Sequence, residues 1–239
     1  YATGLTMTNE KFSKLFGKPV RDPEKEQLTQ FHMDIASSIQ AVIEEIVLKI
    51  TNSLSKSMKS KNLCLAGGVA LNCVANGKIL KNGLYKNIWI QPAAGDAGGA
   101  LGAAIGFWHQ ELKNKRIVNK KDNMKGSYLG PSYEDNKVEK ILNSIKANYK
   151  KYEENELIDI VANEIANGKT VGWFQNRMEF GPRALGSRSI IADPRNKNMQ
   201  KELNLKVKFR ESFRPFAPSV LREDLNDWFD LSFDSPYML

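Results

Sequence analysis

The stretch 177–195, RMEFGPRALGSRSIIADPR, concentrates side chains that can bind anions. Glycine and proline fix the backbone around its arginines, which are Arg177, Arg183, Arg188 and Arg195. Each guanidinium presents a planar fork of donors that suits phosphate and carboxylate groups. Apolar neighbours such as Phe180 and Leu185 favour an inward-facing loop, whose arginines need anionic partners. We predict an anion site here; the alternative is a salt-bridged surface loop.

A second basic stretch, KVKFRESFRPFAP at 206–218, repeats this chemistry. Cations alternate with apolar residues, so in an extended segment Lys206, Lys208 and Arg210 would share one face. That face could bind an anion. It could also be the solvated side of an exposed edge strand.

Two glycine-rich turns precede these stretches. The first follows a short apolar run and places Gly67 and Gly68 before a helical pattern that contains Asn72. A strand, paired glycines and a helix N-terminus present bare backbone N–H groups to an anion or nucleotide. The same pattern also occurs in ordinary packing turns.

The second turn follows the strand-like run 87–90 and contains Gly95 and Asp96 before another helical pattern. Asp96 could cap the helix by accepting backbone N–H bonds. It could also bind a metal or lie near phosphates. The two roles are compatible.

Several elements must position these residues. A long helix over 26–58 carries an apolar stripe at three- and four-residue steps, and we expect it to be core scaffold. The polar segment 114–125 indicates a linker. Periodicity and breakers predict helices at 134–147 and 156–166 and strands at 63–65, 169–174 and 189–192.

Composition excludes some classes. The 239 residues are 41% hydrophobic and carry a net charge of +8, which fits a folded chain with a sizeable core. No apolar run approaches the roughly 20 residues that a membrane helix needs. Cys64 and Cys73 are expected to be reduced core thiols of a cytoplasmic protein, with a catalytic thiol as the alternative. The basic balance suits anionic small substrates as well as nucleic acid.

Together these stretches resemble the O-carbamoyltransferase family, which includes nodulation and antibiotic-tailoring carbamoyltransferases. The matching motifs, in order, are LCLAGGVALNCVANG at 63–77, QPAAGDAGGALGAA at 91–104, RMEFGPRALGSRSIIADPR at 177–195 and FRPFAPSV at 213–220. Their order and their spread over nearly the whole chain make the resemblance specific.

The resemblance implies an α/β fold. It places the second half of an actin-like ATPase (ribonuclease H-like) domain at 1–120 and a C-terminally incomplete YrdC-like α/β domain at 121–239. The smaller domain would join carbamoyl phosphate and ATP into carbamoyl-adenylate. The larger would pass the carbamoyl group to an acceptor hydroxyl on a small molecule, with a divalent metal ion (Fe or similar) as a second cofactor.

The resemblance also implies site roles, carried over position by position. Asp96 matches a metal-ligand aspartate. The nucleotide-contacting positions are Gly67, Gly68, Asn72 and Gly95. The positions expected to hold carbamoyl phosphate and nucleotide phosphates, and so to be catalytic, are Arg183, Arg188, Lys208 and Arg210.

One departure bears on activity. The family's metal site also uses an H-x-x-x-H pair, whereas this chain has only His32 and His109, neither so placed. Ser187 also stands where an asparagine is common. We expect the chain to be an excerpt that lacks half of the larger domain and is inactive alone.

Two other functions remain open from sequence. The same domain types occur in tRNA threonylcarbamoyl transfer, so a tRNA-modifying protein or nucleic-acid-binding scaffold is the runner-up, although no basic-aromatic run favours nucleic acid. A sugar or metabolite kinase of the actin-like class is third, and the arginine-rich second half argues against it.

Overall fold

The computed structural model describes residues 8–118, 121–231 and 233–239. It divides into two compact units, Tyr1–Ser57 and Met58–Leu239, which are described in turn. Of the predicted linker 114–125, residues 119 and 120 lie outside the described residues.

The first unit contains α1 (Glu10–Phe16) and α2 (Gln30–Met58). Asn9 caps α1, because its Oδ1 accepts the backbone N–H groups of Lys11 and Phe12 at 3.0 and 3.2 Å. The helix ends at Gly17, whose φ of 72° is the left-handed conformation of a C-terminal cap. Aromatic side chains of α1 and the start of α2 line a small apolar cavity, among them Phe12, Phe16 and Phe31.

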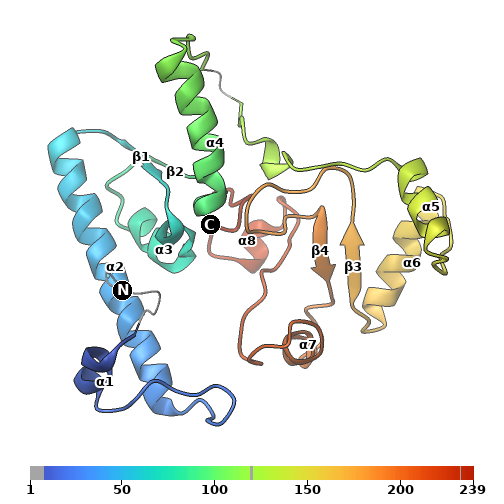
Figure 1. Ribbon diagram of the computed structural model, residues 1–239, viewed down its shortest axis with the longest axis horizontal. Helices are drawn as coiled ribbons and strands as arrows, with labels where there is room; N and C mark the ends of the chain where they lie inside the picture. Colours follow the sequence, from blue (N-terminus) through green and yellow to red (C-terminus); the bar gives the residue numbers. More distant parts are fainter. Residues whose placement is uncertain (1–7, 119–120, 232) are drawn as a thin grey trace. The chain divides into compact units, whose positions relative to one another are not determined.

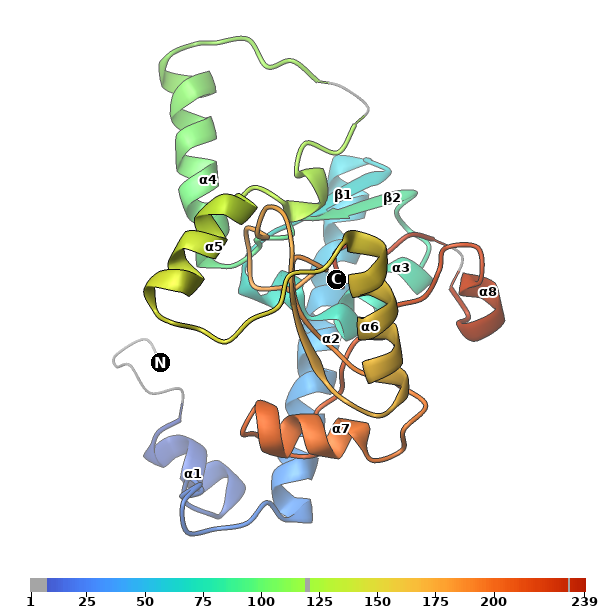
Figure 2. The ribbon, with the colours of Figure 1, turned by 90° about the vertical axis from the view of Figure 1, so that its right-hand side faces the viewer.

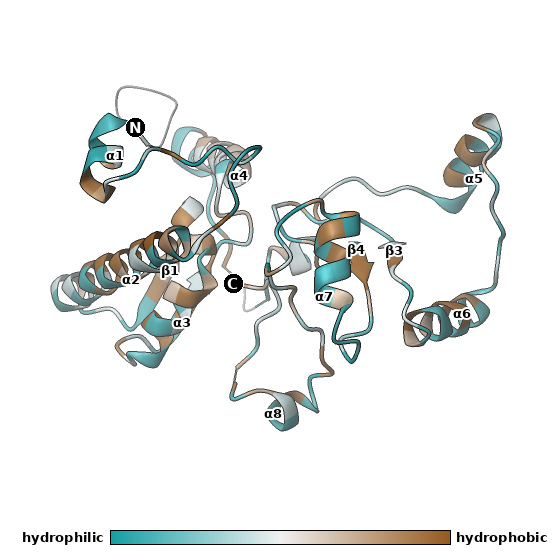
Figure 3. Cartoon of the chain, turned by 90° about the horizontal axis from the view of Figure 1, so that it is seen from below, coloured by the Kyte–Doolittle hydropathy of each residue, from teal (hydrophilic) through white to brown (hydrophobic). Residues whose placement is uncertain are grey.

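The long helix begins four residues later than the sequence predicts, and its stripe is not core. Hydropathy colouring shows apolar and polar faces along α2 (Figure 3). On the apolar face Ile39, Val42, Ile46 and Ile50 are 48 to 59% exposed. The expectation of core scaffold is therefore wrong for this face. Periodicity places apolar residues on one side of a helix, but it does not supply the surface that buries them.

The second unit opens with a parallel pair of strands, β1 (Asn62–Leu65) and β2 (Asn87–Ile90), in which Leu63 lies opposite Ile88. Between them the chain forms the 3-10 turn η1 (Gly68–Leu71) and α3 (Cys73–Lys81) (Figure 1). Parallel strands need such a crossover. Small side chains dominate the buried set around this unit, which includes Leu63, Ala70, Ala75, Ile79, Ala93 and Ala94.

After β2 the chain turns into α4 (Asp96–Gly106), which continues as the π-helical turn η2 (Phe107–Glu111). The short turn η3 (Lys125–Ser127) and two separate helices follow, α5 (Asp135–Ser144) and α6 (Glu154–Ala166) (Figure 2). Then β3 (Val171–Phe174) pairs antiparallel with β4 (Arg188–Ile191). The loop that joins these two strands contains most of the predicted anion-binding stretch.

The C-terminal part contains α7 (Met199–Glu202), the π-helical turn η4 (Leu203–Val207) and α8 (Leu225–Trp228). The expected extended segment from Lys206 is therefore wrong: Lys206 lies on a helical turn and pairs with Glu202 at 3.3 Å. Met199 and Leu203, four residues apart, are both buried, so burial in this segment follows the helical period and not the two-residue period of a strand.

The architecture is mixed α/β, as the sequence predicts. Cys64 and Cys73 are both free but exposed, so the expectation that they are core thiols is wrong. Their side chains point out of the short strand and the first turn of α3, where the buried positions are taken by Leu63 and Ala75. Across the part of the chain that the structure describes, no helix is both long and apolar enough to traverse a bilayer.

Candidate functional site

The first glycine turn packs against the second. Gly67 has a φ of 95°, which only glycine adopts readily, and its N–H donates to the carbonyl of Ala94 at 2.8 Å. Gly68 is exposed, and a side chain there would meet open space. Of the two glycines in this turn that are predicted to contact the nucleotide, Gly67 therefore has its N–H already bonded, while Gly68 is exposed to solvent.

Asn72, the third predicted nucleotide contact, is the N-cap of α3. Its Oδ1 accepts the backbone N–H of Ala75 at 3.1 Å. Asn76, one turn further on, is buried and donates from Nδ2 to the carbonyl of Ala70 at 2.8 Å. These two amides hold the turn η1 against the first turn of α3, so Asn72 fixes the shape of the glycine turn.

The second glycine turn ends at Gly95, which is the N-cap of α4 without a side-chain cap. Asp96 is the first residue of the helix, so the expected N-cap role is wrong by one position. At this position its negative charge interacts favourably with the dipole of α4, although its side chain does not cap the helix. The side chain is exposed and forms no hydrogen bond or ion pair among the described residues.

Close packing explains a neighbouring glycine. Gly98 lies on α4 against the preceding turn, and a Cβ there would fall well inside the contact distance of the Ala93 carbonyl oxygen. Ala93 is fully buried. The turn that precedes α4 is therefore packed against its own helix at position 98, where there is no space for a side chain.

The loop that joins β3 to β4 and ends at Arg188, which we call the arginine loop, closes around the buried carboxylate of Glu179. Its Oε1 accepts the backbone N–H groups of Leu185 at 2.6 Å and Ser187 at 2.9 Å. Its Oε2 accepts Nε of Arg188 at 3.1 Å, and the side chain has no exposed surface. The sequence predicted that inward-facing arginines of this loop would need anionic partners. For Arg188 that partner is Glu179, a residue of the same loop.

The electrostatics of Glu179 follow from these contacts. Burial acts to raise its pKa, but backbone N–H groups, first those of Leu185 and Ser187, and then Arg188 outweigh burial and lower the pKa below its ordinary value. Glu179 is therefore ionised at neutral pH. Arg188 donates a further hydrogen bond from Nη2 to the carbonyl of Gly181 at 2.6 Å.

Arg183 joins the arginine loop to the first glycine turn. Its Nη2 donates to the carbonyl of Leu71 at 3.1 Å, and its Nε is buried without a partner in the described part of the chain. Beside it Gly181, with a φ of 127°, lies against the second turn, where a Cβ would come 3.3 Å from the Pro92 carbonyl oxygen. Three loops predicted separately from the sequence thus meet in one place.

The segment 127–131 supports the arginine loop from its other side. Tyr128 donates from its hydroxyl to the carbonyl of Leu185 at 2.7 Å. The backbone N–H of Phe180 donates to Ser127 at 2.6 Å, and that of Gly130 to Met178 at 2.9 Å. The loop is therefore held by main-chain bonds as well as by its glutamate.

Lys208 and Arg210 lie at the end of η4 and differ from each other. Arg210 donates from Nε to Oδ1 of the fully buried Asn204 at 2.6 Å, and its guanidinium lies 5.0 Å from the ring centre of Phe216. Lys208 is exposed, and its side chain has no hydrogen-bond or ion-pair partner among the residues that the structure describes. Among the described residues, no hydrogen bond or ion pair joins either residue to the arginine loop, so the structure does not bring all four predicted cations together.

The described residues do not fit the implied divalent metal by themselves. Nowhere in 8–118, 121–231 and 233–239 do three His, Cys, Asp or Glu side chains group as a metal site would require. Asp96 is a single carboxylate, and His109 bonds through Nδ1 to the Asn114 carbonyl at 2.9 Å. We therefore derive no chemical step through a metal.

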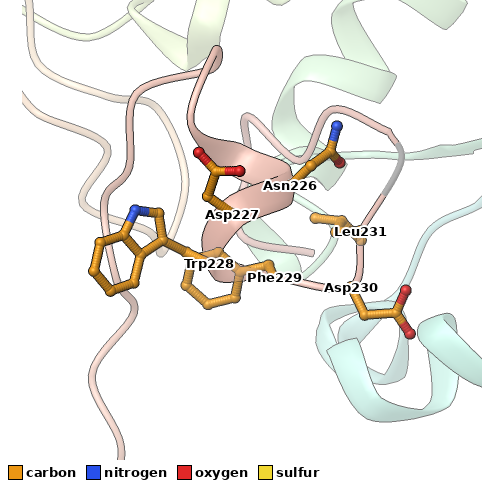
Figure 4. Close-up of a pocket in the computed structure, with 6 residues that line it drawn as sticks. All are labelled: Asn226, Asp227, Trp228, Phe229, Asp230 and Leu231. Atoms are coloured by element: carbon orange, nitrogen blue, oxygen red, sulfur yellow. The ribbon is translucent and has the colours of Figure 1, made fainter.

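A separate surface hollow lies at 226–231 (Figure 4). Only six consecutive residues line it, and the carboxylates of Asp227 and Asp230 do not converge. None of the predicted site residues belongs to it. The hollow is formed by the end of α8 and the residues that follow it. We do not assign a binding or catalytic role to it.

Sequence reasoning missed Glu179, Tyr128 and Asn204, which hold the cations and their loop in place. Glu179 did leave a signal: it is a lone carboxylate between Arg177 and Arg183 in an otherwise basic stretch. A single acid within such a stretch is a candidate internal partner for the arginines.

Comparison with known proteins finds two family models. The carbamoyltransferase N-terminus model matches residues 1–105, and the carbamoyltransferase C-terminus model matches residues 162–239. The Arg183–Leu71 hydrogen bond therefore joins the segments that the two models match.

Curated relatives agree. Uncharacterized protein sll1178 of Synechocystis sp. is 60% identical over the whole of this chain and 39% of its own length. Nodulation protein NolO of Bradyrhizobium diazoefficiens is 42% identical over 85% of this chain and 36% of its own length. Nodulation protein U of Sinorhizobium fredii is 32% identical over 86% of this chain and 35% of its own length. The chain thus spans less than two fifths of the length of each of these relatives. The family models and the relatives together show that the chain belongs to the carbamoyltransferase family.

Proposed function

We propose that the protein to which this chain belongs is an ATP-dependent O-carbamoyltransferase that acts in two steps. Water first hydrolyses carbamoyl phosphate to phosphate and carbamate, and the carbamate oxygen attacks the α-phosphorus of ATP, releasing pyrophosphate. An acceptor hydroxyl on a small molecule then attacks the carbonyl of carbamoyl-adenylate, releasing AMP and a proton. The observation that carries this proposal is the meeting of the arginine loop with both glycine turns.

Charge explains why such a site suits the first step. Carbamoyl phosphate and ATP repel each other, so cationic donors must neutralise and align them. Arg183 and Arg188 would bind these anions from the loop, with Lys208 and Arg210 as further phosphate ligands. Arg188 has Nη1 left for a ligand, because within the described part of the chain only its Nε and Nη2 donate to protein acceptors. Lys208, exposed and flexible, suits a phosphate at the rim.

The nucleotide would approach the glycine turns. Gly68 and Gly95 leave the backbone open, since no atom lies within 4 Å of where their Cβ atoms would be. Gly67 and Asn72 hold the first turn in place through their hydrogen bonds with Ala94 and Ala75. The N-terminus of α4 adds a favourable field for negative charge.

The finer architecture is part of the proposal. We assign 1–120 to the actin-like domain and 121–239 to the YrdC-like domain, with Asp96 as the one metal-ligand candidate in the first. The family models support a division of this kind, because they leave 106–161 unmatched between them. A cytoplasmic location is supported by two cysteines that are both free.

The test measures pyrophosphate in the full-length protein. ATP with carbamoyl phosphate should release pyrophosphate, and omission of carbamoyl phosphate should abolish the release. With a panel of hydroxyl acceptors, mass spectrometry should find a carbamoyl adduct and AMP in equal amounts. Pyrophosphate release that does not depend on carbamoyl phosphate would refute the proposal. Tight tRNA binding that weakens steeply with salt, without carbamoyl transfer, would favour the nucleic-acid function.

A further inference from the structure

Glu179 makes three hydrogen bonds inside the loop that carries the predicted anion-binding arginines. Two come from backbone N–H groups, of Leu185 and Ser187, and both reach Oε1. The third comes from Nε of Arg188 to Oε2. A buried carboxylate normally needs several donors, and here all of them belong to one short segment that follows it in the chain.

The backbone of the segment is built for this closure. Gly181 and Gly186 have φ angles of 127° and 111°, conformations that residues with a side chain rarely adopt. They allow the chain to reverse between Glu179 and Arg188, so that the donors of residues 185–188 point back toward the carboxylate. The carbonyl of Gly181 also accepts Nη2 of Arg188, so the guanidinium is held from two directions.

These contacts determine how Arg188 can meet a ligand. Its side chain is 35% exposed, and Nη1 has no recorded partner among the described residues. Arginine binds anions best when its planar fork is held in one orientation, because less rotamer freedom is then lost on binding. The nearby negative charge of Glu179 reduces the attraction for an anion, so the carboxylate would help binding only by orienting the guanidinium.

We propose that Glu179 is a positioning residue of the anion site, which fixes the guanidinium of Arg188 so that Nη1 serves as the donor to a phosphate group of the substrate. Glu179 does not touch the ligand. The proposal rests on the proposed function for the identity of that ligand.

Glu179→Gln is the informative change. The amide oxygen can still accept from Leu185 and Ser187, so the loop keeps its backbone bonds. The amide nitrogen replaces Oε2 and sets a donor against the Nε of Arg188, so the orientation of the guanidinium is lost. Asp193→Asn is the matched control, because Asp193 is also buried and forms a bidentate pair with a neighbouring arginine, Arg195, outside the loop.

The experiment uses the full-length protein and two probes, carbamoyl phosphate and inorganic phosphate, by calorimetry. We expect Glu179→Gln to raise Kd about tenfold and Asp193→Asn to leave it unchanged. Combined with Arg188→Ala, Glu179→Gln should add nothing to the loss that Arg188→Ala causes alone, because both act through one guanidinium. A merely structural role would instead make the effects of Glu179→Gln and Arg188→Ala on Kd additive.

A second readout does not depend on binding. The Nε–H signal of Arg188 in proton–nitrogen NMR should exchange slowly in the parent and rapidly in Glu179→Gln. Unchanged Kd and unchanged exchange in the variant would overturn the positioning role while leaving the proposed function standing. Failure of the parent to bind either probe would overturn the anion site and the proposed function together.

Discussion

Arg183 donates a hydrogen bond to the carbonyl of Leu71, which lies 112 positions earlier in the chain. The bond joins the arginine loop between β3 and β4 to the turn η1 that follows the paired glycines. Since each partner lies in a segment matched by a different family model, the contact connects the parts of the chain proposed to bind carbamoyl phosphate and nucleotide.

Arg183→Lys tests this contact. Lysine keeps the charge but has a single ammonium group, so it cannot bond Leu71 and a ligand phosphate with a rigid fork. We expect carbamoyl-phosphate-dependent pyrophosphate release by the full-length protein to fall about tenfold or more. Arg177→Lys is the control, because Arg177 is exposed and its side chain bonds only the Gly130 carbonyl in the described structure. Equal losses in both variants would argue against a special role for Arg183.

The two adjacent glycines of α4 should respond oppositely to alanine. A Cβ at Gly98 collides with the Ala93 carbonyl, so Gly98→Ala should lower the free energy of unfolding by about 2–3 kcal/mol. Gly99 meets nothing within 4 Å, so Gly99→Ala should raise it by about 0.5–1 kcal/mol through helix propensity. Urea titration of both variants measures the difference. A tolerated alanine at 98 would show that the turn is not packed as described.

Glu179 should give stability a defined dependence on pH. Its pKa is lowered in the folded chain, so its contribution is complete above the unfolded pKa, about 4.3, and is lost as pH falls through the folded pKa. We expect the parent to be more stable than Glu179→Gln at neutral pH and the difference to shrink below about pH 4. Urea titrations of both proteins from pH 7 to pH 3 measure it. A difference that grows on acidification would mean that the folded pKa is raised.

Limited proteolysis should cut first in the segment that follows η2. Residues 113–118 have no regular structure, and Ile117 and Val118 are 85 and 78% exposed. The segment contains Lys113, Lys115 and Arg116, so trypsin can cleave it without unfolding an element. Mass spectrometry of the earliest fragments identifies the site. First cleavage inside the arginine loop would contradict the hydrogen bonding described for that loop.

Local patterns predicted the elements well. The strands β1 and β2 and the helix α6 lie within two residues of their predicted bounds, because apolar runs, glycines and helix breakers act over short distances. The π-helical turn η4 was missed for the opposite reason. The buried amide of Asn204, which donates to the carbonyls of Ser212 and Arg214, overrides an alternating pattern that is typical of a strand.

The sequence predicted which residue types make up the candidate site, but not which residues contact each other in it. Apolar neighbours of the arginines, such as Phe180 and Leu185, indicated an inward-facing loop, and Arg188 does donate to the carbonyl of Gly181 within that loop. That the loop would close on Glu179, and that Arg183 would reach Leu71, depends on how the chain folds back on itself. A single sequence carries no record of such distant contacts.

The closed loop has a consequence for the kinetics of binding. Ordering one backbone residue costs about 1–2 kcal/mol of conformational entropy at 25 °C, and residues 179–188 bear that cost during folding because their organising carboxylate is covalently part of them. An arriving anion therefore meets a surface that is already formed. Its association rate should depend on diffusion and charge, and so on ionic strength, rather than on a slow rearrangement of the loop.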